Sequence, residues 1–210
     1  MSLYYTEEQA QRALQLGSST LFEASGLNCA VDPAIKAVWR GMGVAAPAYP
    51  LACSPGDNLA LHLALEKVPE GSVLVVTTDS FIAGYWGEVL TVAAQAAGVK
   101  GLIIDGGVRD IAAVQKRGFP LYSRGVAVRG TIKASYKTVG ETVSFTGISV
   151  AAGDLVVADD DGIVVIPAQE VARVLEASEQ REAKERAMMQ KLEAGDTTVD
   201  LMGLAHWRTQ

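Results

Sequence analysis

Two short apolar runs place the strongest limit on how this chain can fold. The first is SVLVVTT, residues 72–78, and the second is GLIID, residues 101–105. Runs of this length without polar alternation are typical of strands that are covered on both faces, as in parallel sheets. Between them lie helix-forming residues, which predict a helix over 85–97 that ends at Gly98. Strand, helix and strand in this order predict a parallel βαβ unit.

Helix-forming segments also flank these two runs. One helix is predicted to begin at Asp57 or Asn58 and to run to about Lys67, because a short polar side chain can cap the first turn. Another helix is predicted from Asp110 to about Arg117. Helix, strand, helix, strand and helix in succession predict an α/β domain that is built on a parallel sheet.

The two ends of the chain have a different character. The pattern predicts a helix over 6–16, and residues 44–53 predict an irregular strand because they include two prolines. After Phe119 we expect a second sheet of short strands, separated by glycines and acidic turns, and then a long amphipathic helix over 169–192. The apolar side of this helix should pack on the domain or on a neighbouring copy.

Composition limits the partners of the chain. It has 210 residues, a net charge of −6 and a pI of about 5.0, and 49% of its residues are hydrophobic. These values fit one domain with a substantial core, and they argue against nucleic acid or an anionic membrane as the main partner. Cys29 and Cys53 have no metal-like spacing, and no apolar run is long enough to cross a bilayer. We therefore expect a cytoplasmic protein with reduced thiols.

Polar residues gather where the two apolar runs end. Residues 77–79 follow the first run, and residues 105–107, then Arg109 and Asp110, end the second. Ligands bind beyond the carboxyl ends of parallel strands, so we expect the glycine pair in 105–107 to turn the chain into the next helix beside a ligand. Arg109 suits an anionic group, and Asp110 suits a hard cation. As neighbours in sequence they would make a poor ion pair.

Each of these residues also has a purely structural interpretation. Asp110 could serve only as a helix cap, Arg109 as a solvated charge, and Glu88 as a first-turn acid. His62 lies on an apolar helix face, where packing is expected. Residues 159–162 lack the later glutamate of a calcium loop and predict a tight turn.

Five segments carry a resemblance to a known family. They are SPGDNLALHLAL (54–65), GSVLVVTT (71–78), YWGEVLTVAAQAAGVKGLIIDGGVRD (85–110), RGFPLYSRG (117–125) and GDLVVADDDGIVVIP (153–167). In their order and spacing the chain resembles the RraA-like family. This family includes class II 4-hydroxy-4-methyl-2-oxoglutarate and 4-carboxy-4-hydroxy-2-oxoadipate aldolases, and also regulators that bind ribonuclease E.

The resemblance implies a fold and an assembly. The expected fold is α/β, a single swivelling-type β/β/α domain over residues 1–210 with parallel strands, a second sheet of small strands and the C-terminal helix over 169–192. The expected assembly is a homotrimer or a pair of trimers.

The resemblance also implies a site. The family aldolases have an acid, twenty intervening residues and then Arg-Asp, and here Glu88 stands at the first position, where the family has Asp, before Arg109 and Asp110. By resemblance, Asp110 binds Mg²⁺ or Mn²⁺, Arg109 contacts the pyruvate oxygen that becomes the enolate oxygen, and Glu88 holds a catalytic water. The residues expected to receive the substrate carboxylate are Gly87, Glu88, Val89 and Leu90.

Three functions follow from the sequence. The first is a metal-dependent aldolase that cleaves 4-hydroxy-2-oxo di- or tricarboxylic acids to pyruvate through a metal-stabilised enolate, with decarboxylation of oxaloacetate as a side activity because it passes through the same enolate. The second is a regulator that binds ribonuclease E without catalysis. The third is a Schiff-base aldolase that uses Lys100, Lys133 or Lys137, although none of them lies in a recognisable apolar pocket.

Overall fold

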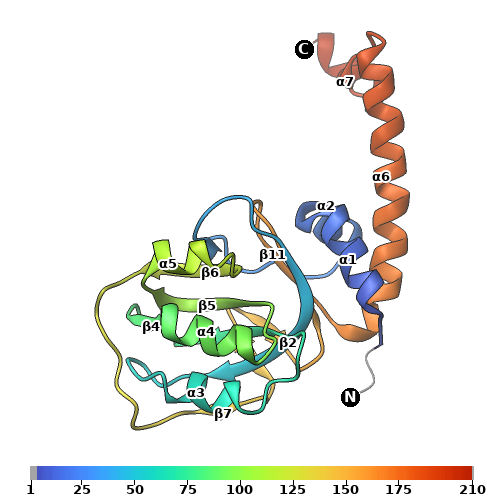
Figure 1. Cartoon of the computed structure of the whole chain (residues 1–210). Helices are drawn as coiled ribbons and strands as arrows, with labels where there is room; N and C mark the ends of the chain where they lie inside the picture. The colour runs from blue at the N-terminus through green and yellow to red at the C-terminus, as the bar shows by residue number, and fades with distance from the viewer. Residues whose placement is uncertain (1–3, 210) are drawn as a thin grey trace.

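The two apolar runs form neighbouring strands at the centre of one curled sheet. The computed structural model describes residues 4–209. Strand β3 (Val73–Thr77) pairs in parallel with β2 (Val44–Ala52) and with β5 (Gly101–Val108), and β6 (Leu121–Val126) pairs in parallel with β5. The predicted α/β fold with parallel strands is therefore confirmed (Figure 1).

Antiparallel strands complete the sheet on both sides. The strand order is β1-β6-β5-β3-β2-β10-β11, with β4 added beside β5 and β7 beside β2. A separate hairpin of β8 and β9 forms the predicted small second sheet, whereas β6, β10 and β11, which were also expected in a second sheet, join the main sheet. The bounds of these strands are β1 Lys36–Ala37, β4 Gly84–Trp86, β7 Thr138–Val139, β8 Val143–Phe145, β9 Ile148–Val150, β10 Leu155–Ala158 and β11 Ile163–Ile166.

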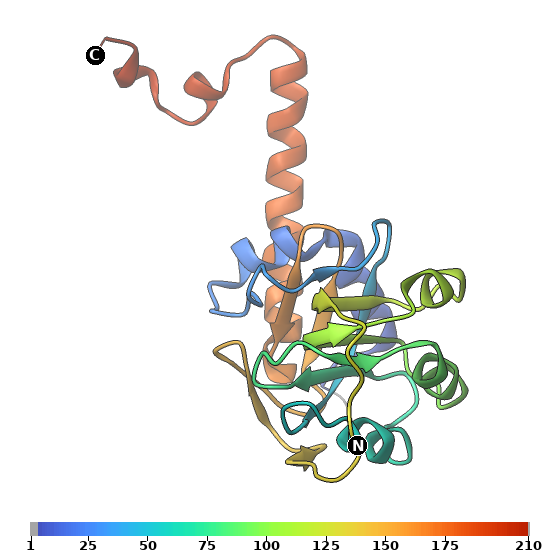
Figure 2. The same ribbon diagram turned by 90° about the vertical axis from the view of Figure 1, so that its left-hand side faces the viewer.

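Two groups of helices cover this sheet (Figures 1 and 2). The group on the parallel strands is α3 (Leu59–Leu65), α4 (Glu88–Ala96) and α5 (Ile111–Lys116). The group at the antiparallel end is α1 (Glu7–Leu16), α2 (Ser18–Ser25) and α6 (Val171–Glu193). Short helical turns are η1 (Ala168–Glu170), α7 (Thr198–Leu201) and η2 (Ala205–Thr209). Helix α1 begins where the sequence predicts, because Thr6 and Gln9 form a capping box there.

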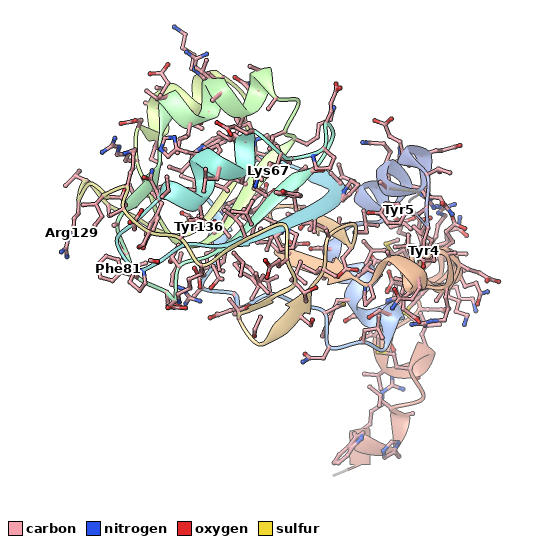
Figure 3. The ribbon with its side chains drawn as sticks, turned by 90° about the horizontal axis from the view of Figure 1, so that it is seen from below. Tyr4, Tyr5, Lys67, Phe81, Arg129 and Tyr136 are labelled. Carbon is pink, nitrogen blue, oxygen red and sulfur yellow. The ribbon has the colours of Figure 1, made fainter. Side chains whose placement is uncertain are left out.

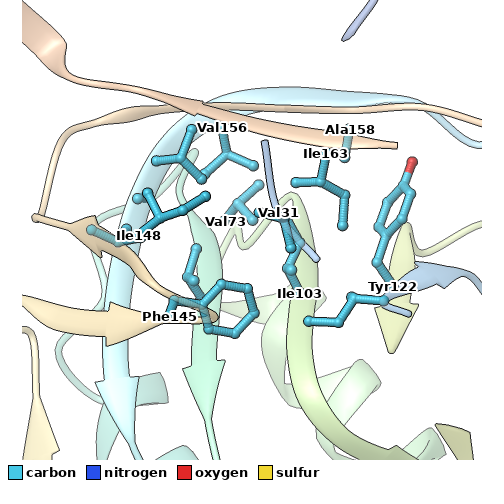
Figure 4. Packing of buried hydrophobic residues seen from close by; sticks show 14 of the residues in the cluster. Val31, Val73, Ile103, Tyr122, Phe145, Ile148, Val156, Ala158 and Ile163 are labelled. Carbon is cyan, nitrogen blue, oxygen red and sulfur yellow. The ribbon is translucent and has the colours of Figure 1, made fainter. Parts of the chain in front are cut away.

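The apolar run of β3 is explained by the cores on its two sides. Val73 and Val75 belong to the core on one face of the sheet, and Leu74 and Val76 belong to the core under the helices on the other face. On the first face the β8–β9 hairpin supplies Phe145, which is fully buried (Figure 4). Burial of such a side chain stabilises the fold by about 1.5–3 kcal/mol.

The prediction of a helix over 85–97 is wrong at its start. Tyr85 and Trp86 belong to strand β4, and helix α4 begins only at Glu88. Both aromatic side chains are fully buried, and β4 pairs with the outer end of β5. The chain uses them to close the core at the carboxyl end of the sheet before it enters the helix. Tertiary packing therefore overrides the local helical pattern at these two positions.

The prediction of a turn at Gly106 and Gly107 is also wrong. These residues continue β5, which runs to Val108. A Cβ atom at Gly106 would lie 2.7 Å from Thr78 Oγ1, and one at Gly107 would lie 2.6 Å from the carbonyl oxygen of Ala83. Close packing at the end of the strand therefore requires the two glycines. The chain turns later, at Asp110.

Strand β2 is more regular than its two prolines predict. It is continuous over nine residues and lies inside the sheet, between β3 and β10. On the side of β10 the pairing ends opposite Pro47, and β7 takes over opposite Leu51. Pro50 lies between these two partners, so the change of partner falls where the strand lacks an N–H donor.

Helix α6 corresponds to the predicted C-terminal helix, but only its first part packs on the domain. Val171, Val174 and Leu175 are buried against the body, whereas Met189 is 54% exposed. The second part of the helix stands clear of the sheet (Figures 1 and 2). Contact between that part and a neighbouring copy stays a prediction. Within residues 4–209 there is no helix long and apolar enough to cross a membrane.

Candidate functional site

A small cavity opens at the carboxyl end of the parallel strands. Its volume is about 250 Å³, and its walls come from the start of α3, from β4, from the β5–α5 junction with the start of α4, and from residues 130–133. Most of the predicted site residues line it, namely Gly87, Val89, Leu90, Arg109 and Asp110. The structure thus brings together, in one cavity, Gly87 and Asp110, which α4 and β5 separate in the sequence.

Asp110 holds an unusual backbone conformation at this cavity. Its φ of 58° and ψ of 36° are left-handed, a region that aspartate tolerates better than most residues. The turn directs the carboxylate back toward α4, where Asp110 Oδ2 accepts a hydrogen bond of 3.1 Å from the backbone N–H of Glu88. Asp110 therefore caps the neighbouring helix α4 rather than its own helix α5. Such an outlier motivates a functional hypothesis for the residue.

Gly87 makes this approach possible. A Cβ atom at Gly87 would collide with Asp110 Oδ2 and would lie 3.2 Å from Arg109 Cγ. The first N–H groups of a helix have no partner within the helix, and they carry a partial positive charge. Asp110 takes the N–H of Glu88, and the next two residues of the same turn, Val89 and Leu90, line the cavity. The start of α4 is therefore suited to receive a carboxylate.

Arg109 is anchored through its backbone and keeps a half-exposed side chain. Its N–H donates to the carbonyl oxygen of Trp86 at 2.8 Å. Arg109 Nε lies 3.9 Å from Asp110 Oδ2, and the two side chains are 49% and 44% exposed. A pair with that distance and exposure contributes about 0–1 kcal/mol. The guanidinium group therefore remains able to bind an anionic group in the cavity.

The side chain of Glu88 points elsewhere. Glu88 Oε1 accepts hydrogen bonds from Arg117 Nε at 3.0 Å and from Arg117 Nη2 at 2.7 Å. This ion pair joins the start of α4 to the end of α5, outside the residues that line the cavity. The backbone of Glu88 thus contributes to the site through Asp110, while its carboxylate is held by Arg117.

Further polar side chains line the cavity, although the family resemblance assigns them no role. Asn58 Nδ2 donates to the carbonyl oxygen of Tyr85 at 3.0 Å, and His62 and Lys133 also line the cavity. Burial, and then the charge of Lys133, lower the pKa of His62, so its imidazole is neutral near pH 7. The spacing of four residues from Asn58 to His62 could have predicted that both face the same cavity, because it places them on one helix face.

A comparison with known proteins supplies the family. The family model described as RraA-like, Aldolase/RraA, matches residues 18–165. The chain belongs to the RraA-like family. One RraA-like relative, from Halalkalibacterium halodurans, is provisionally named a 4-hydroxy-4-methyl-2-oxoglutarate aldolase. It is 30% identical over 154 residues, which are 73% of each chain.

Two solved structures extend the comparison of this RraA-like chain. An uncharacterized protein from Pseudomonas syringae superposes with a TM-score of 0.83 at 29% identity and covers 92% of both chains. RraAS2 from Streptomyces coelicolor, described as an unusual member of the RNase ES inhibitor RraA protein family, has a TM-score of 0.77 at 26% identity and covers 89% of this chain and 98% of its own. The relatives thus include one named for an enzyme and one named for inhibition of a ribonuclease.

In this RraA-like chain, the polar residues that follow β3 serve the fold, contrary to the expectation that they face a ligand. Thr78 and Ser80 donate hydrogen bonds to the buried carboxylate of Asp105 in β5: from Thr78 N at 2.5 Å, from Thr78 Oγ1 at 2.9 Å and from Ser80 N at 3.2 Å. Asp79 and Ser80 have positive φ values of 54° and 59°. The carboxylate of Asp105 is therefore needed to hold this tight turn, and it does not line the cavity.

The metal that the RraA-like resemblance implies can be tested against the residues present. Asp110 is the acid among the residues that line the cavity, its side chain is 44% exposed, and the hydrogen bond from Glu88 engages Oδ2 rather than Oδ1. Mg²⁺ is commonly held by one or two carboxylates together with substrate oxygens and waters. A single half-exposed carboxylate beside the start of α4 fits that donor set.

Proposed function

We propose that this RraA-like protein is a metal-dependent lyase that cleaves 4-hydroxy-2-oxo di- or tricarboxylic acids and releases pyruvate. The observation that carries the proposal is the convergence of Arg109, Asp110 and the start of α4 on one cavity. These groups match a 2-oxo acid, which presents a carboxylate and a keto oxygen side by side. The name of the Halalkalibacterium relative supports the same reaction class.

The helix start binds the substrate and Arg109 acts on the reacting oxygen. The N–H groups of Val89 and Leu90 receive the C1 carboxylate, in the positive field at the start of α4. Arg109 donates to the C2 oxygen, on which negative charge develops as the bond between C3 and C4 breaks. Loss of one such oxyanion donor raises an activation barrier by about 3–4 kcal/mol.

Asp110 would hold the divalent cation of the site. A divalent cation held there, such as Mg²⁺ or Mn²⁺, would supply Lewis-acid polarisation of the keto oxygen. Asp110 has a second task, because its hydrogen bond to Glu88 N fixes the start of α4 beside Arg109. The left-handed turn at Asp110 lets one side chain meet both requirements.

Aldol cleavage also requires an acceptor for the proton of the 4-hydroxyl group. We assign this role to His62, because it lines the cavity and its lowered pKa keeps it neutral. The alternative acceptor is a water held by Glu88, which requires the carboxylate to leave Arg117. Decarboxylation of oxaloacetate needs no such acceptor, so that side activity depends on the start of α4, Arg109 and Asp110 but not on His62.

The test is a coupled assay for pyruvate. The purified protein is supplied with a panel of 4-hydroxy-2-oxo acids and with oxaloacetate, with and without Mg²⁺. We expect pyruvate formation that Mg²⁺ stimulates and that the Arg109→Ala substitution lowers by about 10²–10³-fold, which leaves a measurable residual rate. Chelator-resistant activity that Arg109→Ala retains, or no pyruvate from any substrate, would show that the proposal is wrong.

The second candidate is a regulator that binds ribonuclease E, and the likeness to RraAS2 favours it. A regulator needs its surface and not the Arg109 cavity, so the two candidates separate with one variant. Wild-type and Arg109→Ala proteins are tested for capture of ribonuclease E. Equal capture by both proteins, without aldol activity in either, would support the regulator.

We also propose that the protein acts as a homotrimer or a pair of trimers, in which the exposed part of α6 contacts a neighbouring copy. The support is the apolar surface left on that part and on the following segment, such as Met189, Met202 and Trp207, which are 54%, 56% and 61% exposed. Light scattering at micromolar concentration tests the assembly, and a monomeric mass would refute it.

A further inference from the structure

The segment of residues 127–135 forms a strap across the end of the sheet, and it supplies one wall of the cavity. At its first end, Ala127 N donates to Val108 O at 2.9 Å, and Gly84 N donates to Arg129 O at 2.7 Å. At its other end, buried Asp57 accepts from Ala134 N at 2.8 Å and from Ser135 N at 2.7 Å.

The outer face of the strap is tied down as well. The guanidinium carbon of Arg129 lies 5.3 Å from the ring centre of Phe81, and Figure 3 shows the two residues side by side at the edge of the domain. A cation–π contact at an exposed site contributes about 0.5–1 kcal/mol. The strap is therefore held at both ends and from outside, so its inner carbonyl groups form a fixed wall.

The stem of Arg109 passes between this wall and β4 at the position of Gly84. A Cβ atom at Gly84 would lie 2.8 Å from Ala127 O, 2.9 Å from Arg109 Cδ and 3.2 Å from Arg129 O. The strap approaches the far end of the same side chain too, because a Cβ atom at Gly130 would lie 3.9 Å from Arg109 Nη1. Arg109 thus occupies a slot whose width depends on the missing side chain at position 84.

We infer that Gly84 is a positioning residue for Arg109. Gly84 lines the cavity without a side chain to offer a substrate, and it acts by leaving the space in which the Arg109 stem lies between β4 and the strap. The inference rests on the proposed function, since the position of Arg109 matters only if its guanidinium group meets the keto oxygen. A misplacement of about 1 Å at a reacting centre can lower a rate by about 10²-fold.

A purely structural role for Gly84 makes a different prediction. If the glycine only satisfies sheet packing, Gly84→Ala should lower kcat by the same factor in the wild-type and in the Arg109→Ala background. If it acts through Arg109, the effect on the rate should disappear once the Arg109 side chain is removed. Residues that work as a unit are non-additive in this way.

The experiment is a double-mutant cycle on pyruvate formation from oxaloacetate and from the best aldol substrate. We expect Gly84→Ala to lower kcat by about 10–10²-fold with a smaller change in KM, and to change kcat by less than about two-fold in the Arg109→Ala background. The matched control is Gly125→Ala, two strands away, where Gly84, Gly107 and Gly125 pair across β4, β5 and β6; a Cβ atom at Gly125 would lie 3.7 Å from Ile82 and has room. It should keep wild-type kcat.

The outcomes separate the inference from the proposed function. If Gly84→Ala lowers kcat equally in both backgrounds, or does not lower it at all, the inference is overturned. If Arg109→Ala itself keeps full activity, the proposed role of Arg109 fails first. Should Gly84→Ala not fold, Arg129→Ala tests the same link from the outer face of the strap. A loss of about 2–5-fold that vanishes without Arg109 supports the inference, and an equal loss in both backgrounds overturns it.

Discussion

The cavities at the two ends of the parallel strands differ in volume and in the chemical groups that line them. At the amino end, between α1 and the starts of β2, β3, β5 and β6, lies a cavity of about 530 Å³. At the carboxyl end the cavity is only about 250 Å³. The larger one is lined mainly by apolar residues such as Tyr5, Leu14 and Val44, with Glu70 and Lys100 also in its lining.

The smaller cavity is lined by more of the charged and hydrogen-bonding groups that could bind a substrate or transfer a proton. Two cations, Arg109 and Lys133, meet a carboxylate, a neutral imidazole and the start of a helix there. Parallel strands explain the asymmetry, because the loops and helix starts that follow each strand all lie at the carboxyl end. The arrangement of donors and charges, and not the cavity volume, therefore distinguishes the carboxyl end as the candidate site.

The largest difference in activity should be between two variants, with one substitution at each end of the strands. Arg109→Lys keeps the charge but loses the planar donor fork, so kcat/KM for an aldol substrate should fall by about 10²–10³-fold. Lys100→Met, in the amino-end cavity, should change it by less than about two-fold. Steady-state assays on both variants test the pair. A large loss in Lys100→Met would reverse the comparison and would revive the Schiff-base alternative, which borohydride trapping with pyruvate then examines.

Much of this comparison was accessible from the sequence. The apolar runs predicted buried parallel strands, and Leu74 and Val75 do face opposite cores. The neighbours Arg109 and Asp110 were expected to act separately, and the 3.9 Å distance between them agrees with a weak ion pair. Local patterns sufficed here because strand burial and neighbouring charges depend on short stretches of chain.

Other features depended on contacts between distant segments. The left-handed turn of Asp110, the ion pair of Glu88 with Arg117 and the place of Lys133 in the cavity had no local signal. Asp57 holds residues 134 and 135, which follow it by more than seventy positions, and Ile132 makes backbone hydrogen bonds with Gly56 and Asn58, so these contacts together bring Lys133 to the site. The glycine pair after Asp105 misled the prediction because glycine marks both turns and close packing.

His62 offers the next test, since it distinguishes two reactions at the same end of the sheet. His62→Gln keeps a polar side chain but removes the proton acceptor, so aldol cleavage should fall by about 10²-fold, the low end of the range for a general base. Decarboxylation of oxaloacetate should fall by less than about three-fold, because it needs no acceptor. Both rates are measured on one preparation. Equal losses would mean that His62 serves binding or packing.

Asp110 should show a smaller effect that can be reversed. Asparagine tolerates the left-handed conformation and can still accept the N–H of Glu88, so Asp110→Asn should fold normally. The concentration of Mg²⁺ needed for half-maximal activity should rise by about ten-fold or more, because a neutral amide is a weaker ligand for a hard cation. Calorimetric titration of Mg²⁺ in the presence of pyruvate checks binding independently of turnover. An unchanged affinity would remove Asp110 from the metal site.

Glu88 should matter less than its neighbours in the cavity. Its carboxylate is held by Arg117, so Glu88→Gln and Arg117→Gln should each lower kcat by less than about three-fold in both reactions, the range for a half-exposed ion pair. The kinetics of the two variants are compared with those of Arg109→Lys. A strong loss in aldol cleavage alone for Glu88→Gln would identify Glu88, through a water, as the proton acceptor in place of His62.

The smallest effect concerns stability and again separates the two ends of the sheet. Burial lowers the pKa of His62 from its ordinary value of 6.5, so below that pH the unfolded chain binds a proton that the folded chain resists. Stability should therefore fall as the pH drops through 6.5, until the folded histidine also becomes protonated. His62→Gln removes this contribution and should lose less stability on acidification, whereas Lys100→Met should keep the wild-type dependence. Urea unfolding between about pH 8 and pH 5 measures the slopes. Parallel slopes for wild type and His62→Gln would mean that the imidazole is as easily protonated in the cavity as in water.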